Sequence, residues 1–463
     1  MLCVVRCKLS LMKDFVFPAK TNSCNHIISP SSLIFTLNAE KNCNIYLTGK
    51  YHYTTDVLIT GAGPGGATTA IFLAKEKIPH IIIDKNIFPR DKICGDALSA
   101  KTVDMLKRIT PDWEKLFLPG NAAIVSRGIQ FIAPNNVQLD IPFQLNTAAH
   151  KSPPGFVSKR IDFDNTLVSL MDDQYSNFLS QTSLEDIAYE NDGLTVTVKT
   201  GGETKYIFTK IIIGAEGRGS IVAKKLAGHT MEPNHYSAGI RAYFNGVKNM
   251  HPENFIELHF LKEMQPGYFW IFPLPNGAAN VGLGMLSSAL SAKKINLKQL
   301  MLDTIENHPV IKERFANATL QNKIEGWGLP LGSKKRKLSG ERFLLTGDAG
   351  SLIDPFTGEG IGNAMVSGLV AARVIKKSLD AQNFSAGFLQ QYDADLYKKL
   401  WAELKLSRYL QVLSSKPWLF NFVINKASKS KELRETITCM FDNVDIRKKF
   451  TDPFFYFRIL FNK

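Results

Sequence analysis

The chain has 463 residues, of which 44% are hydrophobic and 21% charged, and it carries a formal net charge of +14. This composition is that of a globular protein long enough for two or three lobes with a sizeable core. No run of about 18 uncharged apolar residues occurs, so no membrane-spanning helix is predicted. The positive charge favours an anionic partner, and a phosphorylated ligand or an anionic membrane explains it as well as nucleic acid does.

The first 52 residues show no sustained apolar periodicity, and we expect an N-terminal extension that is disordered or that reflects a start codon upstream of the true one. They hold four of the six cysteines, whereas Cys94 and Cys439 lie far apart, so neither a disulfide framework nor a metal-binding spacing is indicated. No basic region precedes the short apolar patch at the start, which argues against a secretion signal. A reducing, cytoplasmic setting is therefore predicted.

A glycine turn follows the first predicted strand. The apolar residues 56–60 run into Gly61, Gly63 and Gly66, spaced as G-x-G-x-x-G, and the chain then continues as a helix. A second apolar strand ends at Asp84. This pattern fits a nucleotide cradle, in which the glycines permit a tight turn, close approach of a pyrophosphate and close helix packing. A lone G-x-G-x-x-G is usually an ordinary loop, but a strand, glycines, helix, strand and acid within one βαβ length favour a dinucleotide site.

The segments after Asp84 begin with a polar loop. Residues 85–99 contain Pro and Gly and are too polar for a strand, and a helix through about residue 108 follows them. Residues 121–145 alternate as sheet strands, and an amphipathic helix is predicted near 163–172. The polar loop is therefore a candidate segment of a site.

Two further glycine turns follow apolar strands. A β-meander is predicted from 184 to 208, and a separate strand, 210–213, runs into the glycine turn 214–217. Residues 236–286 again alternate as sheet. The strand 342–347 ends in glycine and acid, and a small-residue helix follows, so the same local pattern occurs three times.

Four apolar strands, at 56–60, 80–84, 210–214 and 342–347, can form one parallel sheet only if the β segments between them leave it and return. We therefore predict an α/β fold in which a Rossmann-like nucleotide-binding domain is interrupted by an antiparallel-sheet substrate domain and followed by a helical tail. The expected boundaries are 1–52 for the extension, 53–120, 155–230 and 335–382 for the nucleotide-binding domain, 121–154 and 231–334 for the substrate domain, and 383–463 for the tail.

With these motifs, the chain resembles the geranylgeranyl reductase family of FAD-dependent oxidoreductases, within the para-hydroxybenzoate hydroxylase-like flavoproteins, over residues 54 to about 380. The resemblance implies FAD as the cofactor, because three glycine turns can serve its adenosine, its ribityl and pyrophosphate groups, and its ring. The cofactor positions that the resemblance implies are Gly61, Ala62, Gly63, Gly65, Gly66, Ala67, Asp84, Lys85, Arg90, Gly95, Arg160, Gly214, Ala215, Glu216, Gly217, Gly347, Asp348, Pro355, Gly358, Glu359, Gly360 and Ile361.

One position departs from the family pattern. Glu216 stands where the wider superfamily has the Asp of an Asp-Gly motif that is tied to both FAD and NADPH. The charge is kept but the reach of the side chain changes. We therefore expect the electron donor to be NADPH or another reductant.

The aromatic stretch Tyr268-Phe269-Trp270-Ile271-Phe272-Pro273 fits the Y-x-W-x-F-P pattern of prenyl reductases, whereas the related halogenases show W-x-W-x-I-P there. Alternation along a strand places Tyr268, Trp270 and Phe272 on one face, where they can line an apolar cavity. These three residues and Pro273 are the expected substrate contacts. The alternative is a set of core aromatics on a buried strand.

Cys94 is open to two interpretations. A free cysteine is commonly a small buried hydrophobe, but the resemblance places this one in a loop beside the flavin ring, where a thiol could position substrate or supply a proton. Arg90 and Lys92 lie close in sequence and would lower a thiol pKa if they point inward. No other acid or base stands out, and no metal site is predicted.

The resemblance favours an enzyme that uses FAD to reduce carbon–carbon double bonds of a polyprenyl lipid or a prenylated small molecule. A flavin-dependent aromatic monooxygenase or halogenase is the first alternative, and a non-catalytic flavin- or lipid-binding protein is the second. No nucleic-acid partner is expected.

The tail, residues 393–463, holds 14 Lys/Arg against 8 Asp/Glu together with several aromatic residues, including Phe454 to Phe457. It either attaches shallowly to anionic lipid on the inner face of the membrane or packs over the substrate domain.

Overall fold

The computed structural model describes residues 49–120, 122–143, 153–430 and 433–435. These begin with a βαβ unit, in which β1 (Tyr53–Thr60) and β2 (His80–Ile83) pair in parallel and are joined by α1 (Pro64–Lys75). The end of β1 and all of β2 are buried, as expected for strands that read as continuous apolar runs. The predicted strand–glycine–helix–strand order is therefore confirmed.

The first sheet has the strand order β18-β19-β11-β1-β2-β8. β11 pairs in parallel with both β1 and β19, so the prediction that four distant segments share one parallel sheet is confirmed. β9 and β10 continue this sheet as an antiparallel extension of β11. The bounds are β8 (Ser176–Leu179), β9 (Thr182–Glu190), β10 (Gly193–Thr200), β11 (Glu203–Gly214), β18 (Ser339–Gly340) and β19 (Phe343–Leu345).

β11 is one strand, where two were predicted. Thr209 and Lys210 interrupt the apolar pattern, but neither ends the strand. The Thr209 hydroxyl bonds the Asp56 and Ile211 carbonyl oxygens, and the Lys210 ammonium lies 3.0 Å from the Asp56 carboxylate. Side chains thus satisfy the polar break, and β11 pairs with β10 in its first half and with β1 through to its end.

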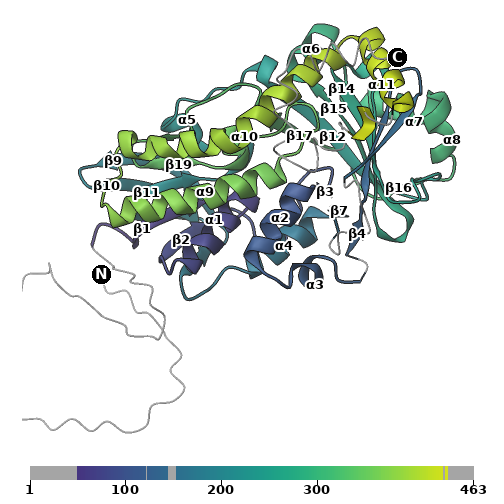
Figure 1. Cartoon of the computed structure of the whole chain (residues 1–463). Helices are drawn as coiled ribbons and strands as arrows, with labels where there is room; N and C mark the ends of the chain where they lie inside the picture. Colours follow the sequence, from purple (N-terminus) through teal and green to yellow (C-terminus); the bar gives the residue numbers. More distant parts are fainter. Residues whose placement is uncertain (1–48, 121, 144–152, 431–432, 436–463) are drawn as a thin grey trace, which may run out of the picture. The chain divides into compact units, whose positions relative to one another are not determined.

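Successive residues of β1 enter different cores, because side chains alternate across a strand. Val57 and Ile59 pack with α1 and α9 (Ile361–Asp380), whereas Leu58 packs with β9, β10 and α5 (Ile221–Lys225). Figure 1 shows α1 and α9 lying side by side, and both pack on the same face of the sheet. Both helices begin at the carboxyl-terminal edge of the parallel strands.

The second sheet has the order β16-β12-β15-β14-β13-β5-β6, with β17 on β12, and every pair except β13 with β5 is antiparallel. One face packs on α6 (Ser287–Lys293), α7 (Leu297–Asn307) and α8 (Pro309–Phe315). The bounds are β5 (Gly128–Ile132), β6 (Gln138–Pro142), β12 (Tyr236–Asn245), β13 (Ile256–His259), β14 (Gly267–Pro273), β15 (Ala278–Leu286), β16 (Thr319–Leu320) and β17 (Glu325–Pro330).

A small sheet, β3-β7-β4, is formed by segments between the two large ones, and three helices accompany it. The bounds are β3 (Ala97–Leu98), β4 (Ala123–Val125), β7 (Phe156–Ser158), α2 (Ala100–Ile109), α3 (Trp113–Phe117) and α4 (Arg160–Ser169). The predicted boundaries between the nucleotide-binding domain, the substrate domain and the tail stay a prediction.

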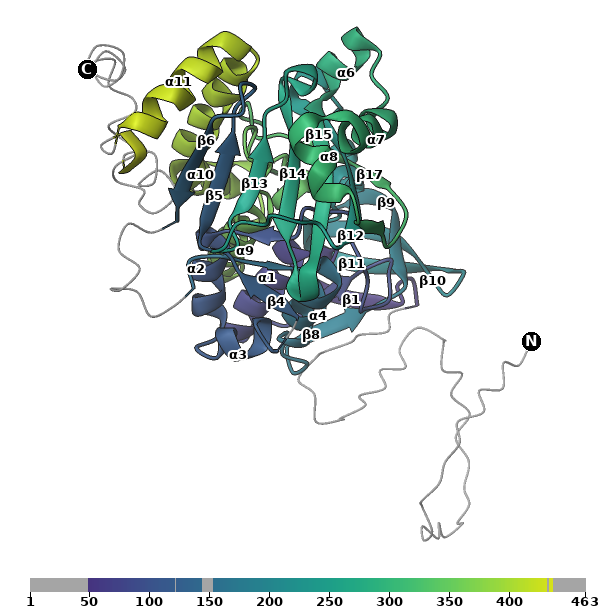
Figure 2. The same ribbon diagram turned by 90° about the vertical axis from the view of Figure 1, so that its right-hand side faces the viewer.

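The predicted helical tail begins as α10 (Ala386–Ser414) and α11 (Pro417–Lys429). α10 extends from the first sheet towards the second (Figure 1), and α11 lies against β6 (Figure 2). The predicted aromatic end, Phe454 to Phe457, lies outside the described residues. Among the described residues, no helix has the length and apolar character that crossing a membrane requires.

Candidate functional site

The carboxyl ends of the parallel strands open onto a cavity of about 920 Å³ that continues to the second sheet and to α10 and α11. In open α/β sheets, this edge is where ligands bind. All three glycine turns contribute to its wall, through Gly61, Gly63 and Gly65, through Gly217, and through Gly347 with Gly358 and Gly360. The repeated local pattern thus converges on one space.

The first glycine turn is shaped by two steric constraints and one opening. A Cβ on Gly66 would lie 1.8 Å from the Gly61 carbonyl oxygen, and Gly61 itself has a φ of +99°. Gly63 differs, because a Cβ there would meet only the Arg90 guanidinium, at 3.7 Å. Asp84 accepts a 2.9 Å hydrogen bond from the Ala62 amide and lines the cavity. The space at Gly63 is therefore open to the cavity.

The hydrogen bonds in the second turn explain why Glu216 stands where the family pattern has Asp. Its carboxylate accepts hydrogen bonds from the Ser220 hydroxyl at 2.7 Å and from the amides of Ile221 and Val222 at the start of α5. A longer side chain than Asp reaches this helix end, where backbone amides are otherwise unpaired. Burial raises the pKa of Glu216, and these hydrogen bonds oppose the rise.

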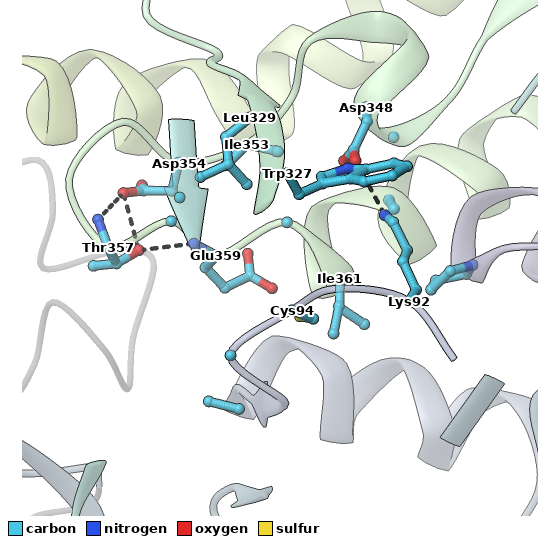
Figure 3. Close-up of a pocket in the computed structure, with 18 of the residues that line it drawn as sticks. Lys92, Cys94, Trp327, Leu329, Asp348, Ile353, Asp354, Thr357, Glu359 and Ile361 are labelled. Carbon is cyan, nitrogen blue, oxygen red and sulfur yellow. Dashed lines mark hydrogen bonds and ion pairs between the residues drawn. The ribbon is translucent and has the colours of Figure 1, made fainter. Parts of the chain in front are cut away.

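The third turn holds Asp348, which forms a 3.2 Å ion pair with Lys92 beside the Trp327 ring (Figure 3), and the Lys92 ammonium lies 6.0 Å from the ring centroid. The nearby Asp354 shapes the chain that follows, since its carboxylate accepts bonds from the Phe356 and Thr357 amides. Glu359 accepts a 2.6 Å bond from the Gly362 amide.

Most predicted cofactor positions line the cavity. Those that do are Gly61, Gly63, Gly65, Asp84, Lys85, Arg90, Gly95, Arg160, Ala215, Glu216, Gly217, Gly347, Asp348, Gly358, Glu359, Gly360 and Ile361, whereas Ala62, Gly66, Ala67, Gly214 and Pro355 do not. Each residue of the second group lies within two positions in sequence of a residue that lines the cavity. Direct contact with a cofactor remains a prediction for each residue.

Cys94 is half-buried on the cavity wall, and its cationic neighbour is Arg160. Arg90 and Lys92, which are close to Cys94 in sequence, also line the cavity, and they are paired with Asp164 at 2.7 Å and with Asp348. Arg160 is also bidentate to Asp164, with both distances 2.7 Å. Although burial opposes it, the Arg160 charge lowers the pKa of Asp164.

The predicted aromatic face of β14 also lies on the cavity, since Tyr268, Trp270 and Phe272 line it and Pro273 does not. Two features hold this face. Gly282, opposite Trp270 on β15, leaves room for the indole, because a Cβ there would lie 2.4 Å from the ring. The indole N–H donates to the Asn280 side chain at 2.9 Å.

Sequence reasoning missed a polar group in the same wall. Asp96 is fully buried and accepts hydrogen bonds from the Tyr243 hydroxyl at 2.7 Å and from the Asn280 amide at 2.8 Å. Arg241 stacks on the Tyr243 ring and pairs with Asp91. These partners lie about 150 to 185 residues apart in sequence, so no local pattern could have found them.

The far end of the cavity is apolar and is closed by the C-terminal helices, which sequence reasoning did not assign to the site. Phe131, Leu139 and Leu258 of the second sheet face Leu410 of α10 and Ile424 of α11 across it. Phe420 of α11 packs on Phe260 of the sheet, with ring centroids 4.5 Å apart. A polar cofactor end and an apolar end thus share one cavity.

These residues fit FAD. The cavity reaches three glycine turns, space is open in front of Gly63, and Asp84 and Asp348 present carboxylate oxygens at strand ends where hydroxyl groups of the cofactor need acceptors. The start of the 20-residue α9, at Gly360 and Ile361, adds backbone amides to the same wall. The arrangement defines a flavin site at the edge of a parallel sheet.

Comparison with known proteins agrees with this geometry. Residues 54–398 match the family model described as FAD binding domain. A menaquinone reductase of Mycolicibacterium smegmatis is 26% identical over 77% of this chain and 86% of its own length. A digeranylgeranylglycerophospholipid reductase of Methanococcus vannielii is 26% identical over 78% of this chain and 87% of its own.

Solved structures share the fold. A geranylgeranyl bacteriochlorophyll reductase-like protein from Thermoplasma acidophilum superposes with a TM-score of 0.72 at 22% identity, covering 86% of this chain and 99% of its own. A flavin-dependent brominase gives 0.69 at 19% identity, covering 86% and 98%. The chain therefore belongs to the family of proteins with this FAD-binding domain, and it is a flavin-dependent oxidoreductase that fits the geranylgeranyl reductase family.

We predict that Gly63→Val lowers FAD occupancy about tenfold or more, because a forced clash with the pyrophosphate costs about 1–3 kcal/mol. The fold should survive, since the added side chain meets open space. The measurement is the flavin-to-protein absorbance ratio of the purified protein. Gly387→Val, in a helix turn with open space and away from the cavity, is the matched control. Full occupancy in Gly63→Val would contradict the cradle.

Proposed function

We propose that the protein reduces carbon–carbon double bonds of a polyprenyl lipid or of a prenylated quinone. The observation that supports this most is the apolar end of the cavity, which adjoins the flavin site and is walled by the aromatic face of β14. Reduced FAD supplies a hydride when bound. The chain has to bind a long apolar molecule beside it and exclude water.

The aromatic wall suits that task. Phe131 and Phe356 line the cavity and stack with ring centroids 6.1 Å apart, and Phe420 of α11 joins them in the lining. Phe260 supports this wall, because it packs on all three rings with centroids 4.5 to 6.0 Å apart. Such a wall offers contact area but few hydrogen bonds, which fits an alkene chain better than a polar aromatic substrate. The relatives named above carry the names of reductases that act on a menaquinone and on a digeranylgeranylglycerophospholipid.

The predicted reductant is NADPH or another donor. Glu216 favours neither donor, because its carboxylate accepts hydrogen bonds from the backbone amides at the start of α5.

The proposal predicts that photoreduced protein is reoxidised without oxygen when a prenyl lipid is added, giving a product two mass units heavier. An anaerobic single turnover with a panel of prenyl lipids and quinones measures this. Products that form only with oxygen would favour a monooxygenase or halogenase, and flavin that stays reduced with every lipid would favour a non-catalytic binder.

We propose that Cys94 contacts the reacting alkene, because it lines the cavity and interacts both with Arg160, a predicted cofactor residue, and with Tyr268 of the aromatic face. Cys94→Ala should keep its FAD and its rate of reduction by the donor, while its reoxidation by alkene slows. Stopped-flow flavin absorbance separates the two half-reactions. Reoxidation at the parent rate would return Cys94 to a packing role.

The outer surface of α10 and α11 supports membrane contact. Tyr409, Val412, Trp418 and Phe422 are 38 to 71% exposed there, although both helices already bury apolar residues on the cavity side. We name these four residues the outer patch. The apolar groups on the cavity side are already buried, so the apolar groups on the opposite side of these helices can contact a second apolar environment, such as a lipid bilayer. The exposed Lys405, Lys416 and Lys429 on these helices favour an anionic bilayer.

The double variant Trp418→Ser/Phe422→Ser should therefore lose most of its co-sedimentation with anionic vesicles while keeping FAD. Tyr189→Ser/Met231→Ser changes two exposed apolar residues elsewhere and should sediment like the parent. Binding should also weaken with salt, since charge contributes. Unchanged sedimentation of the first variant would show that the outer patch does not carry attachment.

A further inference from the structure

A buried acid lies in the cavity wall two residues after Cys94, and the function proposed above gives it no role. Asp96 has no exposed surface, and its neighbours come from β12 and β15. We propose that Asp96 supplies the proton that completes reduction of the double bond, carried on its Oδ1 atom. This inference rests on the proposed function, which supplies the alkene.

The hydrogen bonds decide which oxygen can carry the proton. The Asn280 carbonyl oxygen accepts from the Trp270 indole, so the Asn280 NH₂ group must be the donor to Asp96 and to the Cys94 carbonyl oxygen. The Tyr243 hydroxyl donates to the same Asp96 oxygen, Oδ2. Oδ1 has no partner among the described residues, so the proton of the neutral carboxyl resides there.

The surroundings raise the pKa of this acid. Burial raises the pKa of Asp96 to about 6, against the opposing effects of Asn280, Tyr243 and Arg241. The negative charge of Asp91 further raises the pKa of Asp96. Arg241 forms ion pairs with Asp91 and, at 3.4 Å, with Glu325. Lys159 lies 5.0 Å from the Tyr243 ring centroid. A general acid works best when its pKa lies near the operating pH.

Asp164, another fully buried acid of this region, does not suit the role. It is bound to two arginines, Arg160 and Arg90, and although burial opposes it, the Arg160 charge lowers its pKa. Such a carboxyl stays ionised and holds no proton to give.

The proposed step balances as follows. One alkene carbon receives the hydride that reduced flavin provides, and the flavin is thereby oxidised by two electrons. The alkene π electrons form a C–H bond from the other carbon to the Asp96 proton, as the O–H bond breaks and leaves a carboxylate. The carboxylate takes a new proton from water before the next turnover.

Asp96→Asn is the informative variant. Asp96 has a φ of +68°, a conformation that Asn tolerates well, and an amide oxygen can still accept from Tyr243 and Asn280. We expect FAD content and reduction by dithionite to persist, and alkene-driven reoxidation to slow by about 10²–10⁴-fold. In the parent, this rate should fall about tenfold per pH unit above the pKa of the acid, and we call this falling part of the pH–rate profile the pH limb. The variant should lose the pH limb.

Tyr243→Phe tests whether Asp96 is the titrating acid, because the pH limb would not move if Asp96 had only a structural role. It removes a hydrogen bond that lowers the pKa of Asp96, so the limb should shift to higher pH by about one unit. Glu359→Gln is the matched control, because Glu359 is another acid of the cavity with an oxygen that has no partner among the described residues. Whatever its rate, it should keep the limb in place.

Difference infrared spectra of the carboxyl region, parent minus Asp96→Asn, follow the same titration without turnover. Asp96→Asn with the parental rate and pH limb would overturn the inference, as would a limb that disappears in Cys94→Ala or Glu359→Gln instead. A parent that no prenyl lipid reoxidises would reject the proposed function, and the infrared titration would still report whether Asp96 is protonated near neutral pH.

Discussion

The close approach of Gly66 to the Gly61 carbonyl oxygen is the constraint on which the rest of the site depends. With no side chain there, α1 begins directly above the end of β1. A second glycine likewise allows α9 to pack closely on α1, since a Cβ on Gly368 of α9 would lie 2.5 Å from the Gly65 carbonyl oxygen. Two helices can therefore begin at one edge of the sheet, and their amides face one cavity.

Local patterns in the sequence were sufficient for the parallel sheet. β1, β2, β11 and β19 each read as an apolar run ending in glycine or acid, and steric requirements of glycine do not depend on distant residues. The one error, a break at Thr209 and Lys210, arose because Asp56 on the neighbouring strand satisfies both polar groups. That pairing is visible only in three dimensions.

The contents of the site were less predictable, because they depend on contacts between distant segments. Sequence proximity pointed only to Arg90 and Lys92 as cations near Cys94, whereas the fold adds Arg160, 66 residues further along the chain, and pairs Arg90 and Lys92 with acids. Asp96 likewise acquires its chemistry from Tyr243 and Asn280. The apolar wall from α10 and α11 carried only an amphipathic pattern, which fits any packed helix.

α10 has a consequence for how the protein unfolds. Its 29 residues span about 43 Å. Leu389 and Leu396 belong to the core of the first sheet, where the Tyr392 hydroxyl also bonds the Leu345 carbonyl oxygen of β19, whereas Leu410 reaches the core of the second. One continuous helix thus ties both cores into a single cooperative unit. Neither sheet can melt alone without fraying α10, so a protease cut within this helix would destabilise both.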